Sequence, residues 1–209
     1  MVGRTGKIWS VGRITRKESH AQTRERLVQT AHRLFLSDGY NATSLDKVAT
    51  AAGFSKGAVY SNFSTKHELG LAVLDVIHQE RALSLARAVE GVETVEGRID
   101  AFAVWAEANI GDVGWTALEV EFATSNRRVP GVSQQLASRR RELTAAVAGL
   151  IEQQADELGL MLPAPAEEAA VQLLSLGIGL GVQRAFDPDL SVASLVDLLR
   201  SLLESAARD

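Results

Sequence analysis

The chain has 209 residues, which is enough to bury a sizeable core in one or two domains. It contains no cysteine, so disulfide bonds are excluded and nothing in the composition indicates secretion. Aromatic residues make up only 5% of the chain and only four residues are proline, a balance that favours helices over sheet. The basic N-terminus lacks the apolar run of a signal peptide, and residues 169–182, the longest nearly uncharged stretch, are too few to span a bilayer. We therefore expect a soluble, cytoplasmic protein that does not enter a membrane.

The net charge of −4 conceals two unequal parts. Residues 1–66 carry eleven Lys and Arg against four Asp and Glu, a net charge of +7. Residues 67–209 carry eleven against twenty-two, a net charge of −11. A basic module joined to an acidic body is typical of a protein that contacts nucleic acid with one end. On charge alone, chance segregation of solvated side chains explains the pattern equally well.

Residues 1–20 form a basic segment with three glycines, and we expect a flexible arm. Such an arm could lie along DNA in the minor groove, or it could be only a solvated leader. From Thr23 onward, apolar residues recur at three- and four-residue spacing, which predicts a helix ending at Asp38 and Gly39.

Two short helices are predicted next. Thr43 stands three residues before Asp46, a variant of the capping box, and indicates that the first of them begins there. A glycine turn at Gly53 leads to the second, at about residues 56–63. Ser55 can cap that helix, because its hydroxyl accepts a bond from an otherwise unpaired backbone N–H.

The second short helix has the features of one that docks into a DNA major groove. Lys56 brings a positive charge to its start. Gly57 and Ala58 have almost no side chain, so the backbone could approach a surface closely. Further polar side chains follow one helical turn later, at Tyr60, Ser61 and Asn62.

A long helix from about Lys66 to Val89 is predicted to join the basic module to the acidic body. It opens with Thr65 and Glu68, which form a capping box. No strand pattern or internal repeat competes with helices in the rest of the chain, so the fold class is all-α with about nine helices. The remaining helices are expected at about residues 95–109, 115–128, 132–158, 166–186 and 191–207.

The stretch from about Thr23 to Leu74 resembles the helix-turn-helix of the TetR family of bacterial transcriptional regulators. It covers roughly a quarter of the chain, and the remainder resembles the family only in its length and helical character. The resemblance rests on Ala31, Leu34, Phe35, Gly39, Tyr40, Ala42, Thr43, Ser44, Leu45, Val48, Ala49, Ala52, Gly53, Ser55, Lys56, Gly57, Val59, Tyr60, Asn62, Phe63, Lys66 and Leu69.

The resemblance implies two sets of DNA-binding residues. Free N–H groups near Thr43 and Ser44 suit a phosphate, and Lys56 could reach a guanine edge. For Tyr60, a ring packed in the core is the alternative. Family members commonly carry an aromatic residue or His at positions 61 and 62, so the Ser–Asn pair here gives no operator sequence. The groove-facing set is Ser55, Lys56, Gly57, Ala58, Ser61 and Asn62, and the phosphate set is Thr43, Ser44, Tyr60 and Lys66.

The segments 166–186 and 191–207 are the candidate dimer interface. The first is apolar nearly all round, which for a helix outside a membrane indicates burial on most sides. In the family the last two long helices pair with their symmetry mates as a four-helix bundle, which implies a homodimer. The alternative is that both helices belong to the core of one subunit.

Two tryptophan-bearing segments could line a pocket for a small molecule, since apolar walls with a few polar groups are typical of such sites. Glu119 would be a half-buried carboxylate favouring a cationic or hydrogen-bond-donating ligand. Ordinary core packing is the alternative for the aromatic residues, and an ion pair is the alternative for Glu119. The candidate lining residues are Phe102, Trp105 and Asn109 on one helix and Trp115, Leu118, Glu119 and Phe122 on the next.

Nucleotide-binding, nucleophile and metal-ligand motifs are absent from the sequence, so we expect no enzyme activity, cofactor or metal. The predicted organisation is an arm at 1–20, a helix-turn-helix domain at 21–67 and a ligand-binding and dimerisation domain at 68–209. The expected function is a homodimeric regulator, a repressor rather than an activator, which binds a palindromic double-stranded DNA operator and is released by a small molecule. A ligand-independent or activating regulator, or a non-specific architectural DNA-binding protein, remains the alternative.

Overall fold

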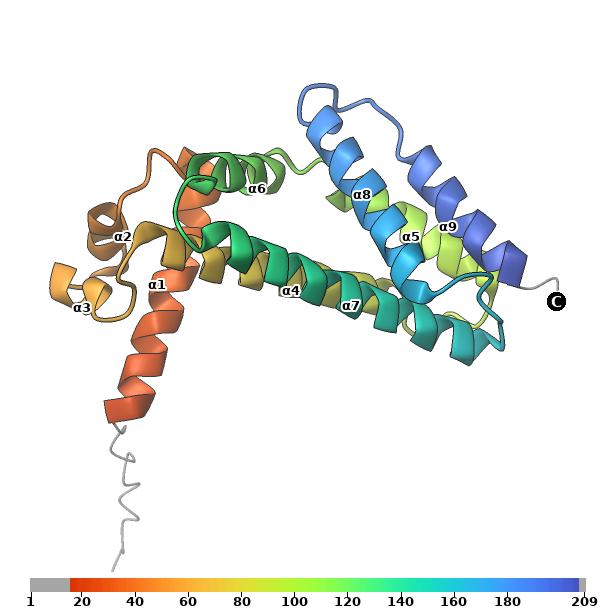
Figure 1. Ribbon diagram of the computed structural model, residues 1–209, viewed down its shortest axis with the longest axis horizontal. Coiled ribbons are helices and arrows are strands. Elements are labelled where there is room, and N and C mark those ends of the chain that lie inside the picture. The colour runs from red at the N-terminus through yellow and green to blue at the C-terminus, as the bar shows by residue number, and fades with distance from the viewer. Residues whose placement is uncertain (1–15, 207–209) are drawn as a thin grey trace, which may run out of the picture.

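The computed structural model describes residues 16–206 and confirms an all-helical fold for this part of the chain, with nine helices and no strand (Figure 1). None of these helices is long and apolar enough to cross a membrane. The helices are α1 (Arg16–Asp38), α2 (Leu45–Ala52), α3 (Lys56–Tyr60), α4 (Lys66–Val89), α5 (Val95–Asn109), α6 (Val113–Asn126), α7 (Val132–Leu158), α8 (Ala166–Arg184) and α9 (Ala193–Ala206).

Several expected boundaries differ from the structure by a few residues, and two of these differences lie in α1 and α3. Residues 16–20, expected in the flexible arm, belong to α1, while residues 1–15 lie outside the described part. The second short helix ends at Tyr60 rather than at about residue 63, and residues 61 and 62 form a turn. The N–H groups of Asn62 and Phe63 still bond to the carbonyl of Val59, so the backbone remains paired beyond the helix.

The helices form an elongated molecule with two ends (Figure 1). Helices α1, α2 and α3 lie at one end and α5, α8 and α9 at the other, while α4 and α7 run between them. The first end has its own apolar core, in which Phe35, Val48 and Phe63 are almost completely buried. Burial of side chains of this size stabilises the fold by about 1.5–3 kcal/mol each, which fixes the short helices in place.

Side-chain caps define where the short helices begin. Ser55 accepts the N–H of Ala58 at 3.2 Å, as its place before the helix predicts. For α2, however, the cap is Ser44, which accepts the N–H of Lys47 at 3.1 Å, and not Thr43. The expected capping box at Thr43 is therefore wrong by one residue.

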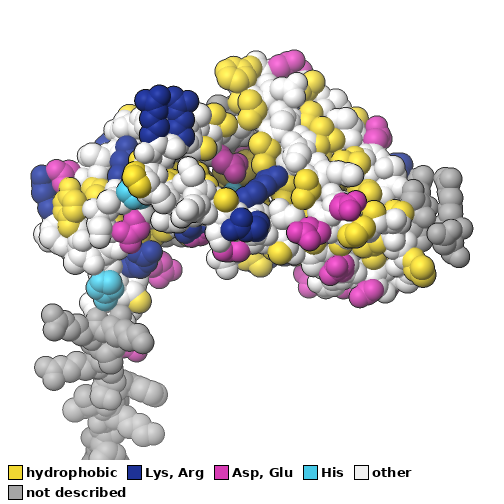
Figure 2. Space-filling view, in the orientation of Figure 1, with side chains coloured by type: hydrophobic (Ala, Val, Ile, Leu, Met, Phe, Trp, Pro, Cys, Tyr) yellow, Lys and Arg dark blue, Asp and Glu magenta, His cyan; other side chains and the backbone are white. Residues whose placement is uncertain are grey.

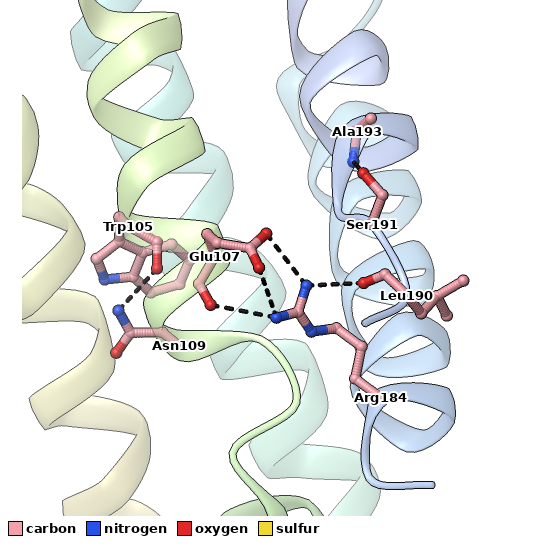
Figure 3. A network of polar contacts seen from close by, with 7 residues as sticks. All are labelled: Trp105, Glu107, Asn109, Arg184, Leu190, Ser191 and Ala193. Carbon is pink, nitrogen blue, oxygen red and sulfur yellow. Dashed lines mark hydrogen bonds and ion pairs between the residues drawn. The ribbon is translucent and has the colours of Figure 1, made fainter. Parts of the chain in front are cut away.

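At the far end, the buried guanidinium of Arg184 holds α8 against α5 and the α8–α9 connection (Figure 3). It donates to both carboxylate oxygens of Glu107, at 2.8 and 3.1 Å, and to the carbonyl of Leu190 at 2.8 Å. The turn after α5 fits closely around this side chain. A Cβ added to Gly111, which has a φ of +90°, would lie 2.4 Å from the Cβ of Arg184.

Replacing Arg184 with Gln should lower the melting temperature by roughly 5 °C, because the Leu190 carbonyl and Glu107 lose their donor. Circular dichroism melts would measure the change. The control is Arg128→Gln, since Arg128 is exposed, and it should leave the melting temperature within about 1 °C.

The same comparison has a pH dependence. The hydrogen bond from Arg184 lowers the pKa of Glu107 from its ordinary value of 4.5. A carboxylate whose pKa is depressed by folding contributes stability above its unfolded pKa and loses that contribution as the pH falls through the folded value. The difference between wild type and Arg184→Gln should therefore shrink below about pH 4. A difference that persists unchanged into acid would show that packing, and not the ion pair, is responsible.

Candidate nucleic-acid interface and ligand cavity

Helix α3 presents a polar outer face and an apolar inner one. Val59 is fully buried against the core, whereas Ser55, Lys56, Gly57 and Ser61 are exposed. Gly53 has a φ of +73°, a left-handed conformation that glycine adopts easily, and makes the turn from α2 into this segment. The two helices and the turn thus leave the start of α3 open to a large partner.

Tyr60 and Ala58 complete this surface. The Tyr60 side chain is 52% exposed, so it is not the core residue that the alternative interpretation required. Ala58 is half-buried beside it. An exposed phenol one turn from the helix start can donate its hydroxyl proton to a phosphate oxygen.

Lys56 is held by an ion pair rather than free in solution. Its Nζ lies 2.5 Å from Oδ2 of Asp46 on α2, and this contact raises the pKa of Lys56. Both side chains are largely exposed, so solvent screens the attraction. Lys56 can therefore exchange Asp46 for a base edge at small cost.

Asn62 does not present its amide outward. Its Nδ2 donates to the carbonyl of Ala58 at 2.8 Å, and its Oδ1 is buried without a hydrogen-bond partner. The expectation that Asn62 faces the groove is therefore corrected, because the amide turns back on α3.

The expected phosphate-binding residues also differ in whether they are exposed. Ser44 is exposed at the N-terminus of α2. Thr43 is completely buried, with its hydroxyl 3.4 Å from the carbonyl of Leu34, and so cannot contact a phosphate as expected. Lys66 is half-buried: its Nζ donates to the carbonyl of Asn41 at 3.2 Å and lies over the Tyr40 ring, and desolvation lowers its pKa.

Two arginines on α1 support the interface and were missed by sequence analysis. Arg24 lies 4.1 Å from the centre of the Phe63 ring and donates to the carbonyl of Asn62. Arg26 lies over Phe54 and donates to the carbonyl of Ala52. These contacts tie α1 to both sides of the α2–α3 segment. In the sequence the two arginines contributed only to the net charge.

The body contains a cavity of about 200 Å³ between α4, α5, α7, α8 and α9. Three of the expected lining residues, Phe102, Trp105 and Trp115, do line it. Asn109 does not line it. Its amide instead donates to the carbonyl of Trp105 at 2.7 Å and accepts a bond from Arg81.

The expectation that Leu118 and Phe122 line the cavity is wrong. Both are almost fully buried in the core of the α1–α3 end, where the Phe122 and Tyr40 rings meet edge to face at 5.1 Å. Glu119 lines a separate pocket between α6 and α8 and lies 3.6 Å from Nε2 of His78. Helix α6 therefore turns only its first residues toward the cavity.

Most of the cavity wall comes from helices that carried no recognisable ligand motif. Their leucines and isoleucines had the spacing of ordinary core residues, so sequence analysis could not separate the two roles. In the described part of the chain, no group of three His, Cys, Asp or Glu side chains could hold a metal ion. The wall includes Leu85, Leu143, Val147, Leu150, Ile151, Leu173, Leu174 and Leu199.

Helix α6 is fastened to the turn between α1 and α2. The Glu121 carboxylate accepts the N–H of Tyr40 at 2.8 Å and the N–H of Asn41 at 3.1 Å. Ser125 adds a hydrogen bond to the Asn41 side chain at 3.0 Å. Since Trp115 on the same helix lines the cavity, α6 contacts both the cavity and the α1–α2 turn.

A short capped helix that packs at its turn against a second one, with an exposed polar face, is a helix-turn-helix. The fold therefore defines a class, the helix-turn-helix DNA-binding proteins that carry a helical C-terminal body.

Comparison with known proteins gives the family. Residues 27–73 match the model of the tetR family of bacterial regulatory proteins. The transcriptional regulator TtgR of Pseudomonas putida is 38% identical over 80 residues, 38% of each chain. UidR of Escherichia coli is 28% identical over 127 residues, 60% of this chain and 63% of that one. The chain thus matches less than two thirds of the length of these curated relatives.

Solved structures share the fold over nearly the whole chain. GusR of Salmonella enterica has a TM-score of 0.64 at 23% identity, covering 91% of this chain and 98% of that one. A putative regulator of Saccharomonospora viridis, solved in complex with choline, has a TM-score of 0.63 at 19% identity, covering 88% and 96%. The helix-turn-helix segment is therefore that of the TetR family of bacterial regulatory proteins, and the rest of the described chain shares the fold of the solved regulators.

The packing of α4 against α6 can be tested with two glycines. A Cβ on Gly70 would lie 2.5 Å from the Phe122 ring, so Gly70→Ala should separate the helices and lower the free energy of unfolding by about 1–3 kcal/mol. A Cβ on Gly149 of α7 meets nothing within 4 Å, so Gly149→Ala should raise it by up to about 1 kcal/mol. Urea titrations would measure both. Equal effects would contradict the close contact.

Proposed function

We propose that the protein is a ligand-responsive transcriptional repressor, which binds a palindromic DNA operator as a homodimer and releases it when a small molecule enters the body. The observation that carries this proposal is that one helix, α6, contacts both the cavity and the helix-turn-helix end. The known relatives are transcriptional regulators, which supports the DNA-binding role.

The proposed DNA surface is the open face around the start of α3. Ser55, Lys56, Gly57, Ala58 and Ser61 would face the major groove. Ser44, Tyr60 and Lys66 would contact phosphates on either side, with Ser44 adding the free N–H groups of a helix N-terminus. On the face shown in Figure 2, most acidic side chains lie over the body, so they are distant from this surface.

One such surface is too small for tight specific binding, and two-fold dimers place two copies about one helical turn apart on a palindrome. We propose that α8 and α9 make the dimer. Helix α8 exposes Val171 at 47%, and Phe186 just after it is 87% exposed. Apolar side chains this exposed favour burial against another chain.

Release would follow from a population shift. A ligand that binds one placement of α6 better than another moves the α1–α2 turn and thereby the two α3 helices relative to each other. The coupling needed is about 1–3 kcal/mol, which is typical of allosteric pairs.

The DNA surface is tested by selecting duplexes from a random pool and titrating salt on the best site. Lys66→Ala should weaken binding to all duplexes and reduce the salt slope by about one unit per site, because a phosphate contact is lost. Lys56→Ala should instead change which sequences are selected. Arg128→Gln, which removes an exposed positive charge outside α2 and α3, is the control.

If both lysine variants bind like wild type, the proposed surface is wrong. Equal, weak binding of selected and random duplexes by the wild type would instead favour the architectural interpretation over a sequence-specific regulator.

The α6 contact is tested by amide hydrogen exchange with and without the selected duplex. In the wild type, DNA binding should raise the protection of residues 113–126. Glu121→Gln should reduce that rise several-fold, because a donor NH2 group replaces one of the two carboxylate oxygens that accept the N–H groups of Tyr40 and Asn41. Glu80→Gln, an exposed position on α4, is the matched control. A rise that is unchanged in Glu121→Gln would exclude this contact as the connection between the two ends.

A further inference from the structure

The polar groups around the cavity indicate what kind of ligand it accepts, if the proposed ligand response holds. Among the described lining residues, four besides the tryptophans carry polar side chains: His78, Arg81, Arg98 and Gln154. A ligand must match the hydrogen-bonding capacity that the protein leaves unused, because an unpaired polar group in an apolar cavity is costly.

Arg98 is largely occupied by contacts within the protein. Its Nε donates to the carbonyl of Val92 at 2.7 Å. One terminal nitrogen donates to the Gln154 side chain at 2.7 Å, and the other pairs with Glu157 at 2.9 Å. Its charge is therefore neutralised by Glu157, and most of its donors are used, together with the Gln154 oxygen.

Arg81 is likewise taken up by the protein. It donates to the side chain of Asn109 and pairs with Asp112 at 3.2 Å. Asp112 is in turn the N-cap of α6. A carboxylate ligand would have to displace one of these acids, and no acidic side chain among the described lining residues is available to a cationic ligand. The cavity thus favours a neutral molecule.

Two buried polar atoms of the wall residues have no hydrogen-bond partner. They are Nε1 of Trp115 and Nε2 of His78. The other tryptophan of the wall differs, since Nε1 of Trp105 donates to Ser84 at 3.2 Å. Buried polar atoms without partners are rare enough in folded proteins that each indicates a missing partner.

Both residues belong to the region where α4 and α6 pack together. His78 contacts Glu119 and, one turn on, Arg81 contacts Asp112 and lies over the Trp115 ring at 5.5 Å. The indole N–H can only donate, whereas a histidine nitrogen can donate or accept. Nε2 of His78 already lies 3.6 Å from Oε1 of Glu119, so the indole N–H is the group that needs an oxygen acceptor.

We propose that the effector is a neutral, mainly apolar molecule with one carbonyl or hydroxyl oxygen, which accepts a hydrogen bond from the indole N–H of Trp115. This assignment rests on the proposed ligand response. It replaces the expectation that Glu119 selects a cationic ligand, because Glu119 lines the neighbouring pocket and contacts His78 from that side. The oxygen would bind at the first turn of α6, which is the end of that helix nearest the cavity.

The test uses four compounds that share one aromatic frame, with affinities measured by calorimetry on the full chain. They are 2-acetylnaphthalene, 2-ethylnaphthalene, 2-naphthoate and 2-naphthylmethylammonium. The ketone should bind about fivefold more tightly than the hydrocarbon, as one net hydrogen bond allows. It should bind at least about tenfold more tightly than either ion, because neither ion finds a free partner.

Trp115→Phe keeps an aromatic ring and removes the N–H. In this variant the ketone and the hydrocarbon should bind within about twofold of each other. The matched control is Trp105→Phe, whose lost N–H is bonded to Ser84 in the wild type, so the fivefold preference should remain even if both affinities fall. Infrared difference spectra of the ketone bound to wild type give a readout without a variant. Its carbonyl stretch should lie below the value in hydrocarbon solvent.

The outcomes separate this assignment from the proposed function. Preferential binding of the naphthoate or the ammonium, an unshifted carbonyl stretch, or a ketone preference that survives Trp115→Phe would overturn the ligand chemistry and leave the cavity as a ligand site. If none of the four compounds binds, the cavity is not a ligand site and the ligand-responsive part of the proposed function fails with it.

Discussion

The docking of α6 on the turn between α1 and α2 is the contact on which the rest of the arrangement depends. The N–H groups of Tyr40 and Asn41 follow the end of α1 and have the Glu121 carboxylate as their acceptor. The adjacent Phe122 ring leaves no room for a Cβ at Gly70 of α4. A charge-assisted pair of hydrogen bonds next to a close apolar contact fixes both the orientation and the position of α6 relative to α1 and α4.

Local features of the sequence predicted the helices well, because caps, glycine turns and apolar spacing act within a few residues. The bounds of α4, α5 and α7 agree with those expected. The packing partners of α6 could not be predicted from such local features. Both of its faces carry apolar residues, and spacing alone cannot tell whether Leu118 and Phe122 face a cavity or another core.

The DNA-facing surface shows the same division between local and distant causes. The expected set followed from residue type and resemblance, and most of its members are exposed. Thr43 and Asn62 differ because atoms from other turns reach them: the Leu34 carbonyl lies against the Thr43 hydroxyl, and Ala58 takes the Asn62 amide. Arg24 and Arg26 were missed for the converse reason, since their aromatic partners lie 28 or more residues away in the sequence.

The position of the unpaired Trp115 indole, in the first turn of α6, explains how a ligand in the cavity could affect the α1–α2 turn. The N-cap of α6 is Asp112, which also pairs with Arg81, so the start of the helix is already held by an ion pair at the cavity wall. A ligand oxygen bound by Trp115 would add a contact at that same turn. A helix of 14 residues is about 21 Å long and resists bending, so a shift at its start is transmitted to Glu121 and Ser125 near its end. Those two side chains hold the backbone and side chain of residues 40 and 41, just before α2. The ligand would change DNA affinity only as far as its contact with Trp115 differs between the two placements of α6.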